Sequence, residues 1–317
     1  MFFGVLGVSA ADLAREAGQW REPAAFVDLG QEENDVSELV LPPCPVIGIG
    51  PRDHRLAHRM DTIVEAGFEA AAIADAIARQ PLAAAAVTQL LRLVPSLSLE
   101  EGLAAESMAY AMLQGSAAHR AWIAVQPLRE AKPEGRVDLS RVNDDLVVTL
   151  DRPEAGNAID RAMRDRLHEA FGLANVDETI ARIVLRAKGK AFSLGAELSE
   201  FGTTTDPATA HRIRCLTLPA REAVRCAGRL EVEVDGACVG AGLELAAYAR
   251  RITATRRSWF QLPELAMGIL PGAGGCVSLT RRIGRQRALL MILSGRRIKA
   301  SRALDWGLID ALMDEIS

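Results

Sequence analysis

The chain has 317 residues, of which 49% are hydrophobic and 25% charged, and its formal net charge at pH 7 is −4. A chain of this length can bury a large core and divides, as a soft expectation, into about two domains. The slightly acidic balance does not favour a surface for phosphate backbones, so we expect no nucleic-acid partner.

The five cysteines are odd in number and lack CxxC spacing, so we expect neither a disulfide framework nor a zinc site. The five histidines show no metal-ligand spacing, and we expect no bound metal. No uncharged apolar run reaches about 20 residues, the length of a membrane span. The apolar N-terminus lacks the basic region of a signal peptide. These features favour a cytoplasmic protein.

Residues 1–60 contain few sequence patterns that indicate structure or function. AFVDL (Ala25–Leu29) and PVIGIG (Pro45–Gly50) predict short strands, and Ser9 predicts the cap of a helix that follows it. GIG alone does not make a dinucleotide-binding loop, because the rest of the G-x-G-x-x-G motif is missing. We assign no function to this segment.

Residues 61–132 predict a helical region. Alanine-rich segments on both sides of Pro81 carry apolar residues at helical spacing, and Ser98 with Glu101 has the spacing of a capping box. So many alanines favour close helix–helix contacts, and we expect a packing layer without chemistry. Residues 133–145 are polar, contain proline and glycine, and predict a linker.

From residue 146 onward, strand-like and helix-like segments alternate. LVVTLDRP (Leu146–Pro153), RIVLRAKG (Arg182–Gly189) and RITATRR predict strands, with helical patterns between them. Such alternation predicts an α/β fold built from strand–helix–strand units.

Two turns of small residues could expose backbone N–H groups. Gly195 permits a tight turn that leaves the N–H of Ala196 reachable, and the GAG sequence around Ala241 places another N–H at a helix start. Two such groups that converge would form an oxyanion hole for an enolate.

Glu244 and Glu264 are the acidic residues near these turns. If burial tunes their pKa values, they could position a water molecule or move a proton. Other interpretations stay open, because the helix dipole alone favours Glu244 in a first turn, and Glu264 could cap the turn after Pro263. Neither a P-loop nor a G-x-S-x-G elbow is present.

From residue 146 the chain resembles the crotonase (enoyl-CoA hydratase/isomerase) superfamily. Five ordered motifs carry the resemblance: LVVTLDRPEAGNAID, GKAFSLGAELSEF, VDGACVGAGLELA, FQLPELAMGILPGAGG and RRIGRQRALLMILSGRRIKASRALDWGLID. The resemblance implies an α/β, crotonase-like (ββα) spiral core over residues 146–317, preceded by an N-terminal helical region. It also implies an acyl-CoA thioester as substrate, no cofactor besides this CoA, and a homo-oligomer, either a trimer or a hexamer.

The resemblance implies roles for individual residues. Ala196 and Ala241 match the oxyanion-hole residues, although glycine is usual at the second position. Glu244 and Glu264 match the two glutamates that hold and activate water. Because both acids are present, hydration of a 2-enoyl-CoA is the expected reaction. An enoyl-CoA isomerase or another crotonase-type enzyme is an alternative, and so is a non-catalytic CoA-binding or assembly subunit. The residues expected to contact substrate are Ala155, Leu194, Ala196, Glu197, Leu198 and Ala241.

The order of the segments differs from that of the family. A helical tail usually follows the WGL segment, whereas here Ala74–Pro133 resembles that tail and precedes the core. Two hypotheses fit this order: a circularly permuted crotonase, or a degenerate first unit fused to a second unit without its own tail. Both predict that residues 61–132 pack where the family's C-terminal helices do.

Overall fold

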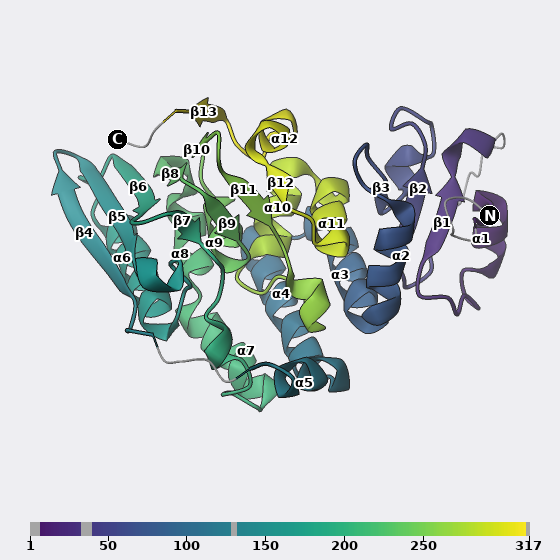
Figure 1. Ribbon diagram of the computed structural model, residues 1–317, viewed down its shortest axis with the longest axis horizontal. Helices are drawn as coiled ribbons and strands as arrows, with labels where there is room; N and C mark the ends of the chain where they lie inside the picture. The colour runs from purple at the N-terminus through teal and green to yellow at the C-terminus, as the bar shows by residue number, and fades with distance from the viewer. Residues whose placement is uncertain (1–6, 33–39, 128–131, 315–317) are drawn as a thin grey trace.

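The structure is a computed structural model that describes residues 7–32, 40–127 and 132–314 (Figure 1). Its largest sheet has six strands in the order β13-β10-β8-β6-β5-β4, and only the β4–β5 pair is antiparallel. The strands of this sheet are β4 (Arg136–Val142), β5 (Asp145–Asp151), β6 (Arg182–Ala187), β8 (Leu230–Val234), β10 (Arg251–Thr255) and β13 (Ala311–Met313).

A second sheet has four strands in the order β12-β11-β9-β7. Its strands are β7 (Ala191–Ser193), β9 (Ala237–Val239), β11 (Trp259–Gln261) and β12 (Ile298–Lys299). Consecutive strands alternate between the two sheets: β6, β8 and β10 belong to the first sheet, and β7, β9 and β11 belong to the second. Helices follow each of the consecutive couples β6–β7, β8–β9 and β10–β11. This repeat confirms the predicted crotonase-like ββα core.

Helices follow each strand pair and bury their apolar faces in the core. The helices of the core are α6 (Arg161–Val176), α7 (Pro207–Thr217), α8 (Pro219–Cys226), α9 (Ala241–Ala246), α10 (Gly275–Ile283), α11 (Arg285–Ser294) and α12 (Ala300–Asp305). The 3-10 turns are η1 (Leu29–Gln31), η2 (Ala57–Arg59), η3 (Val94–Ser96), η4 (Pro153–Ala155), η5 (Leu198–Glu200), η6 (Ala227–Arg229) and η7 (Glu264–Met267). In α11 the run Ala288–Leu293 is entirely buried, and Gly295 ends the helix in the left-handed conformation.

The helical region packs on this core. Its helices are α2 (Ala70–Arg79), α3 (Pro81–Leu93), α4 (Leu99–Gln114) and α5 (Ala117–Ala124). Pro81 begins α3, where no helical N–H is required, and Ser98 with Glu101 forms the predicted capping box. Buried side chains of this region, such as Val87, share one hydrophobic cluster with core residues such as Leu290. The packing leaves both hypotheses about the segment order open.

Among the described residues, no single helix is long and apolar enough to cross a membrane. The pair formed by α2 and the segment Pro81–Ser96 meets the length and composition requirement together, but it is bent by 108°.

The N-terminal segment forms a small unit at one end of the molecule (Figure 1). Its elements are α1 (Ala10–Glu16), β1 (Ala25–Asp28), β2 (Val46–Ile49) and β3 (Thr62–Ile63). Both predicted strands and the Ser9 cap are confirmed. The unit has a hydrophobic cluster of its own, which includes Leu13, Val27 and Met60. Its parallel sheet, β1-β2-β3, has the order and direction of β6-β8-β10 in the core.

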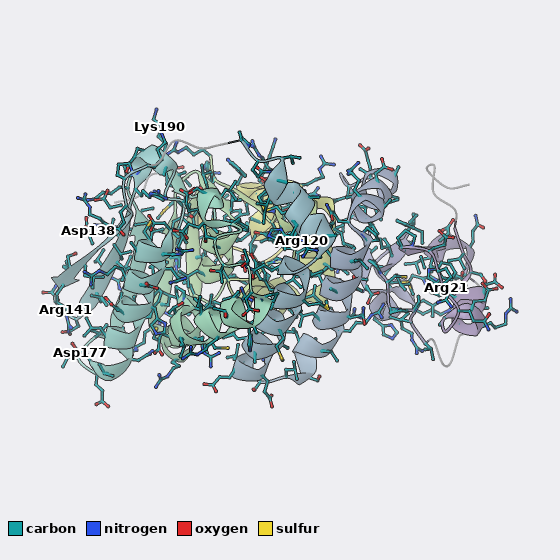
Figure 2. All side chains as sticks on the ribbon, turned by 90° about the horizontal axis from the view of Figure 1, so that it is seen from below. Arg21, Arg120, Asp138, Arg141, Asp177 and Lys190 are labelled. Atoms are coloured by element: carbon teal, nitrogen blue, oxygen red, sulfur yellow. The ribbon has the colours of Figure 1, made fainter. Side chains whose placement is uncertain are left out.

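The linker prediction for residues 133–145 is wrong over Arg136–Val142, which form β4. β4 pairs with β5 along seven residues, and Asn143, with a φ of 54°, lies in the turn between them. The strand was not predicted because it is exposed on the edge of the sheet and carries charged side chains. Asp138 and Arg141 project from it in Figure 2. Its sequence therefore lacks a sharp alternation of buried and exposed residues.

Candidate active site

A cavity of about 370 Å³ lies between the core and the helical region. This volume falls in the range of small-molecule sites, about 300–1,000 Å³. Its walls come from α4 and α5 of the helical region and from α6, α7, α9, η5 and η7 of the core. All four residues expected to act in catalysis, Ala196, Ala241, Glu244 and Glu264, line this cavity.

The turns that carry Ala196 and Ala241 lie side by side. They follow β7 and β9, which pair in parallel. A Cβ on Gly195, whose φ is +96°, would lie 3.3 Å from the carbonyl oxygen of Val239. Within the described chain, neither alanine N–H donates a hydrogen bond, and Ala241 is the first residue of α9. Two unpaired N–H groups on adjacent turns have the chemistry of an oxyanion hole.

Glu244 is buried in the first turn of α9 and is held by backbone amides. Its Oε2 accepts hydrogen bonds from the N–H of Ala273 at 2.7 Å and the N–H of Gly275 at 2.8 Å. Burial raises the pKa of Glu244 from 4.5 to about 7, and the two amide bonds oppose this increase. A carboxyl with this pKa exists in both protonation states near neutral pH.

Glu264 begins η7 and has a different environment. Its Oε2 is buried and has no hydrogen-bond partner in the described residues. Its Oε1 lies against Gly240, where a Cβ would come within 2.6 Å of it. Burial and then the charge of Glu244 raise the pKa of Glu264 well above 4.5. Both effects favour the protonated form of the Glu264 carboxyl.

A third buried carboxyl, Glu106, comes from α4 and was not predicted. Its Oε1 accepts a hydrogen bond from the N–H of Gly274 at 2.6 Å, and its Oε2 accepts one from the N–H of Cys276 at 2.8 Å. Glu106 and Glu244 thus bind alternate amides of the glycine-rich turn 273–276. Burial and the charge of Glu244 raise the pKa of Glu106 well above 4.5. The expectation that the helical region carries no part of the site is wrong for α4.

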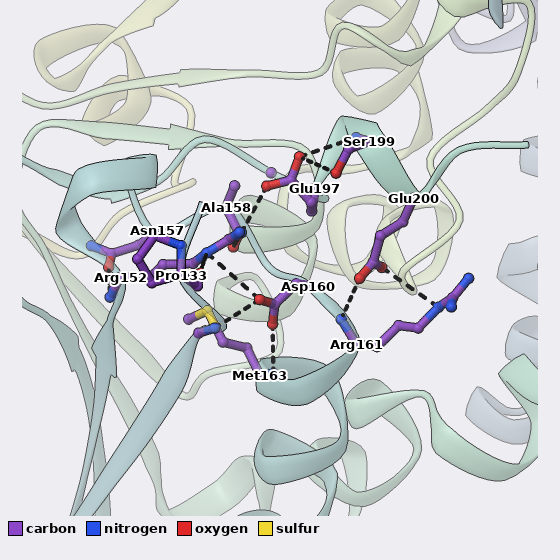
Figure 3. Close-up of polar contacts among 12 residues, drawn as sticks. Pro133, Arg152, Asn157, Ala158, Asp160, Arg161, Met163, Glu197, Ser199 and Glu200 are labelled. Atoms are coloured by element: carbon purple, nitrogen blue, oxygen red, sulfur yellow. Dashed lines mark hydrogen bonds and ion pairs between the residues drawn. The ribbon is translucent and has the colours of Figure 1, made fainter. Parts of the chain in front are cut away.

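A buried arginine network fixes another wall of the cavity (Figure 3). The Arg152 side chain is 4% exposed and donates to Glu197 Oε2 at 2.7 Å and to the carbonyl oxygens of Pro133 and Ala158. It also forms an ion pair with Asp160 at 3.6 Å. The network joins η4, the start of α6 and η5, and so orders the loops around Ala196.

The residues expected to contact substrate fall into two groups. Leu194, Ala196, Glu197, Leu198 and Ala241 line the cavity, whereas Ala155 does not. Ala155 ends η4, and the next residue, Gly156, lies under the side chain of Leu194. Leu194 is 49% exposed, and it marks the open side of the cavity.

Other lining residues come from helices that the sequence did not connect with the site. Tyr110 of α4 lies with its ring against Gly272, where no Cβ would fit. His119 of α5 hydrogen-bonds through Nδ1 to the carbonyl oxygen of Met267 at 2.8 Å and so holds the end of η7. Burial lowers the pKa of His119. The helical region therefore completes the cavity and supports both acidic turns.

The cavity combines two N–H donors, one carboxyl whose pKa is raised well above 4.5 and a second carboxyl whose pKa is about 7. Such a set can stabilise negative charge on a carbonyl oxygen and move protons at a neighbouring carbon. Among the described residues, no group of three or more His, Cys, Asp or Glu side chains has the arrangement of a metal site.

Comparisons with known proteins agree with this chemistry. The family model described as enoyl-CoA hydratase/isomerase matches residues 143–316. A 2,3-dehydroadipyl-CoA hydratase of Escherichia coli (strain K12) is 34% identical over 171 residues, which cover 54% of this chain and 66% of that protein. A mevalonyl-coenzyme A hydratase of Beauveria bassiana is 34% identical over 191 residues, which cover 54% of this chain and 64% of its own length. The chain thus spans about two thirds of the length of these curated relatives.

Solved structures give the same result. An enoyl-CoA hydratase of Thermoplasma volcanium has a TM-score of 0.52 and 33% identity, with coverage of 56% of this chain and 72% of that one. An enoyl-CoA hydratase of Mycobacterium smegmatis has a TM-score of 0.51 and 30% identity, with coverage of 57% and 70%. The resemblance based on the five motifs is confirmed. Since the family model matches more than half of its residues, the chain belongs to the enoyl-CoA hydratase/isomerase family.

Proposed function

We propose that the protein is an enoyl-CoA hydratase, which adds water across the C2–C3 double bond of a 2-enoyl-CoA thioester. The observation that carries the proposal is the pairing of two unlike buried carboxyls, Glu244 and Glu264, with two unpaired N–H groups in one cavity. The hydratase names of several relatives support the same reaction.

The roles follow from the environment of each group. The N–H groups of Ala196 and Ala241 hold the thioester oxygen, and they stabilise the enolate that forms as the double bond opens. Glu244, fixed through Oε2, positions a water molecule and accepts one of its protons while the hydroxyl bonds to C3. Glu264 donates its proton to C2. Water is thereby added as a hydrogen at C2 and a hydroxyl at C3, and proton exchange with solvent restores both carboxyls. The reaction needs no metal or redox cofactor.

Isosteric substitutions test this assignment. Glu244→Gln and Glu264→Gln should each lower kcat for hydration by roughly 100- to 10,000-fold, because each removes proton transfer. Binding of a saturated acyl-CoA, which needs no proton transfer, should be retained in both variants. Unchanged turnover in both variants would refute the hydratase mechanism. If the wild-type protein binds thioesters but converts none of them, a non-catalytic CoA-binding or assembly subunit replaces the enzyme.

Isomerisation of a 3-enoyl-CoA is the second candidate. The free oxygen of Glu264 favours it, because one carboxyl without fixed partners can carry a proton between two carbons of the chain. Product analysis with 2-enoyl and 3-enoyl thioesters distinguishes the two reactions. A homo-oligomer, expected to be a trimer or a hexamer, stays a prediction that light scattering can measure.

For the N-terminal part of the chain, we favour the degenerate-unit hypothesis over circular permutation. Support comes from the order of β1-β2-β3, which repeats that of β6-β8-β10, and from the helices that follow it. A permuted tail alone would require no such sheet. On this hypothesis residues 1–60 have lost their catalytic turns. A protein that begins at residue 61 should then retain hydration, whereas a folded truncation without turnover would contradict the hypothesis.

A further inference from the structure

Arg214 is an arginine of α7 that lines the cavity without a carboxylate partner. The Arg161 and Arg164 side chains also line the cavity, and they pair with Glu200 and Asp165 respectively. Within the described part of the chain, no carboxylate forms a salt bridge with Arg214. This difference among the three cavity arginines needs a physical explanation.

The contacts of Arg214 are all with neutral groups. Its Nε donates to Ser107 Oγ at 3.0 Å, its Nη2 donates to the Ser107 carbonyl oxygen at 3.1 Å, and its Nη1 donates to Gln114 Oε1 at 3.2 Å. Its Cζ lies 4.5 Å from the centroid of the Tyr110 ring. These bonds fix the guanidinium on α4 but use only three of its five N–H donors and provide no salt bridge.

A largely buried guanidinium without a salt-bridge partner is costly. Burial lowers the pKa of Arg214, which reflects the penalty on its charged form. Arg152, the deeply buried arginine behind another wall of the cavity, has two acidic partners. The charge of Glu106 on α4 acts favourably on Arg214, but Glu106 forms no salt bridge with it, and its two oxygens accept backbone N–H groups. The missing counter-ion is therefore one that a ligand would supply.

Tyr110 connects Arg214 with the reaction centre. One part of its ring lies against Gly272, next to the turn that holds Glu244, and its face lies under the Arg214 guanidinium. The oxyanion-hole turns approach the cavity from β7 and β9, whereas Arg214 approaches from α7. An acyl chain fixed by its thioester oxygen and passing Tyr110 would bring a distal substituent to the guanidinium.

We propose that Arg214 binds a carboxylate at the distal end of the acyl chain, so that the preferred substrate is the CoA thioester of a dicarboxylic acid. This inference rests on the proposed function in that the ligand is an acyl-CoA. The planar guanidinium matches a carboxylate through paired N–H donors, which a hydroxyl or an unsubstituted chain end cannot use. Arg214 is thus a specificity-determining residue, held in place by Ser107 and Gln114.

Binding of saturated thioesters, which cannot be hydrated, tests the inference by calorimetry. Adipyl-CoA and hexanoyl-CoA have the same chain length and differ in the terminal carboxylate. The wild-type protein should bind adipyl-CoA roughly 10- to 100-fold more tightly, the range expected for hydrogen bonds to a charged group. Arg214→Gln should remove this preference, and Arg214→Lys, which keeps the charge without the fork, should retain part of it. The control Arg212→Gln changes an exposed neighbour on α7 and should leave the preference intact.

Each outcome separates this inference from the proposed function. Equal affinity of the wild-type protein for the two thioesters overturns the role of Arg214 and leaves the hydratase proposal standing. An equal loss of both affinities in Arg214→Gln also overturns it, because Arg214 would then bind a CoA phosphate or serve the fold alone. If the wild-type protein binds neither thioester, the acyl-CoA site itself is refuted. If Arg214→Gln does not fold, Arg214→Lys supplies the comparison, and a wild-type protein without the preference overturns the inference by itself.

Discussion

The difference in unfolding free energy between Glu244→Gln and the wild type should grow in favour of the variant as the pH rises. The buried carboxyl has its pKa raised from 4.5 to about 7 in the folded state. Ionisation therefore costs more in the folded than in the unfolded protein, and the wild type loses stability as the pH rises from about 4.5 through about 7. A shift of about 2.5 pH units corresponds to about 3 kcal/mol at 1.36 kcal/mol per unit. Glutamine keeps the shape and can accept the same two amide bonds, but it cannot ionise.

Urea unfolding at several pH values between 5 and 8 measures the effect. The difference in unfolding free energy between Glu244→Gln and wild type should grow in favour of the variant by roughly 2–3 kcal/mol over this range. The matched control is Glu178→Gln, which changes an exposed glutamate and should give a curve parallel to wild type. If the Glu244→Gln curve is also parallel to wild type, the pKa of Glu244 is not raised in the folded state and the reasoning fails.

Three further predictions concern the site. The kcat/KM for hydration should rise with pH through about 7, because Glu244 must be ionised to accept a proton from water; a flat profile would contradict this role. Gly240→Ala places a Cβ 2.6 Å from a Glu264 oxygen at a φ of +46°, and kcat should fall roughly 100-fold. Gly228→Ala, whose Cβ meets no atom within 4 Å, should leave kcat unchanged. Arg152→Met removes the cationic partner of Asp160 and Glu197, and urea unfolding should show a loss of about 3–5 kcal/mol.

Sequence patterns identified the parts of the site that depend on local structure. Gly195, Ala241 and Glu244 lie in strand–turn–helix segments, where a few neighbouring residues determine which groups are exposed. The crotonase resemblance supplied the roles, because spacing alone also permitted a dipole or capping role for both glutamates. The structure places these residues around one cavity, as the motifs imply.

The parts contributed by the helical region could not be predicted in this way. Glu106 binds the N–H of a residue 168 positions later in the chain, and no local pattern encodes this contact. In the sequence, Glu106 and Tyr110 resemble ordinary residues of an alanine-rich helix. The role of Arg214 likewise depends on the packing of α4 against α7. This packing supplies hydrogen-bond partners for the guanidinium but no salt bridge. The β4 strand was missed for a different reason, since both its faces are largely exposed and its apolar residues do not alternate regularly with burial.

A hydration assay with 2-enoyl-CoA thioesters tests the central claim most directly, with wild type, Glu244→Gln and Glu264→Gln compared at pH 7. The proposal predicts conversion to the 3-hydroxyacyl-CoA by the wild type. Each variant should lose at least roughly 100-fold in kcat but still bind a saturated thioester. Hydration at the wild-type rate by both variants, or no hydration of any 2-enoyl-CoA by the wild type, would contradict the account.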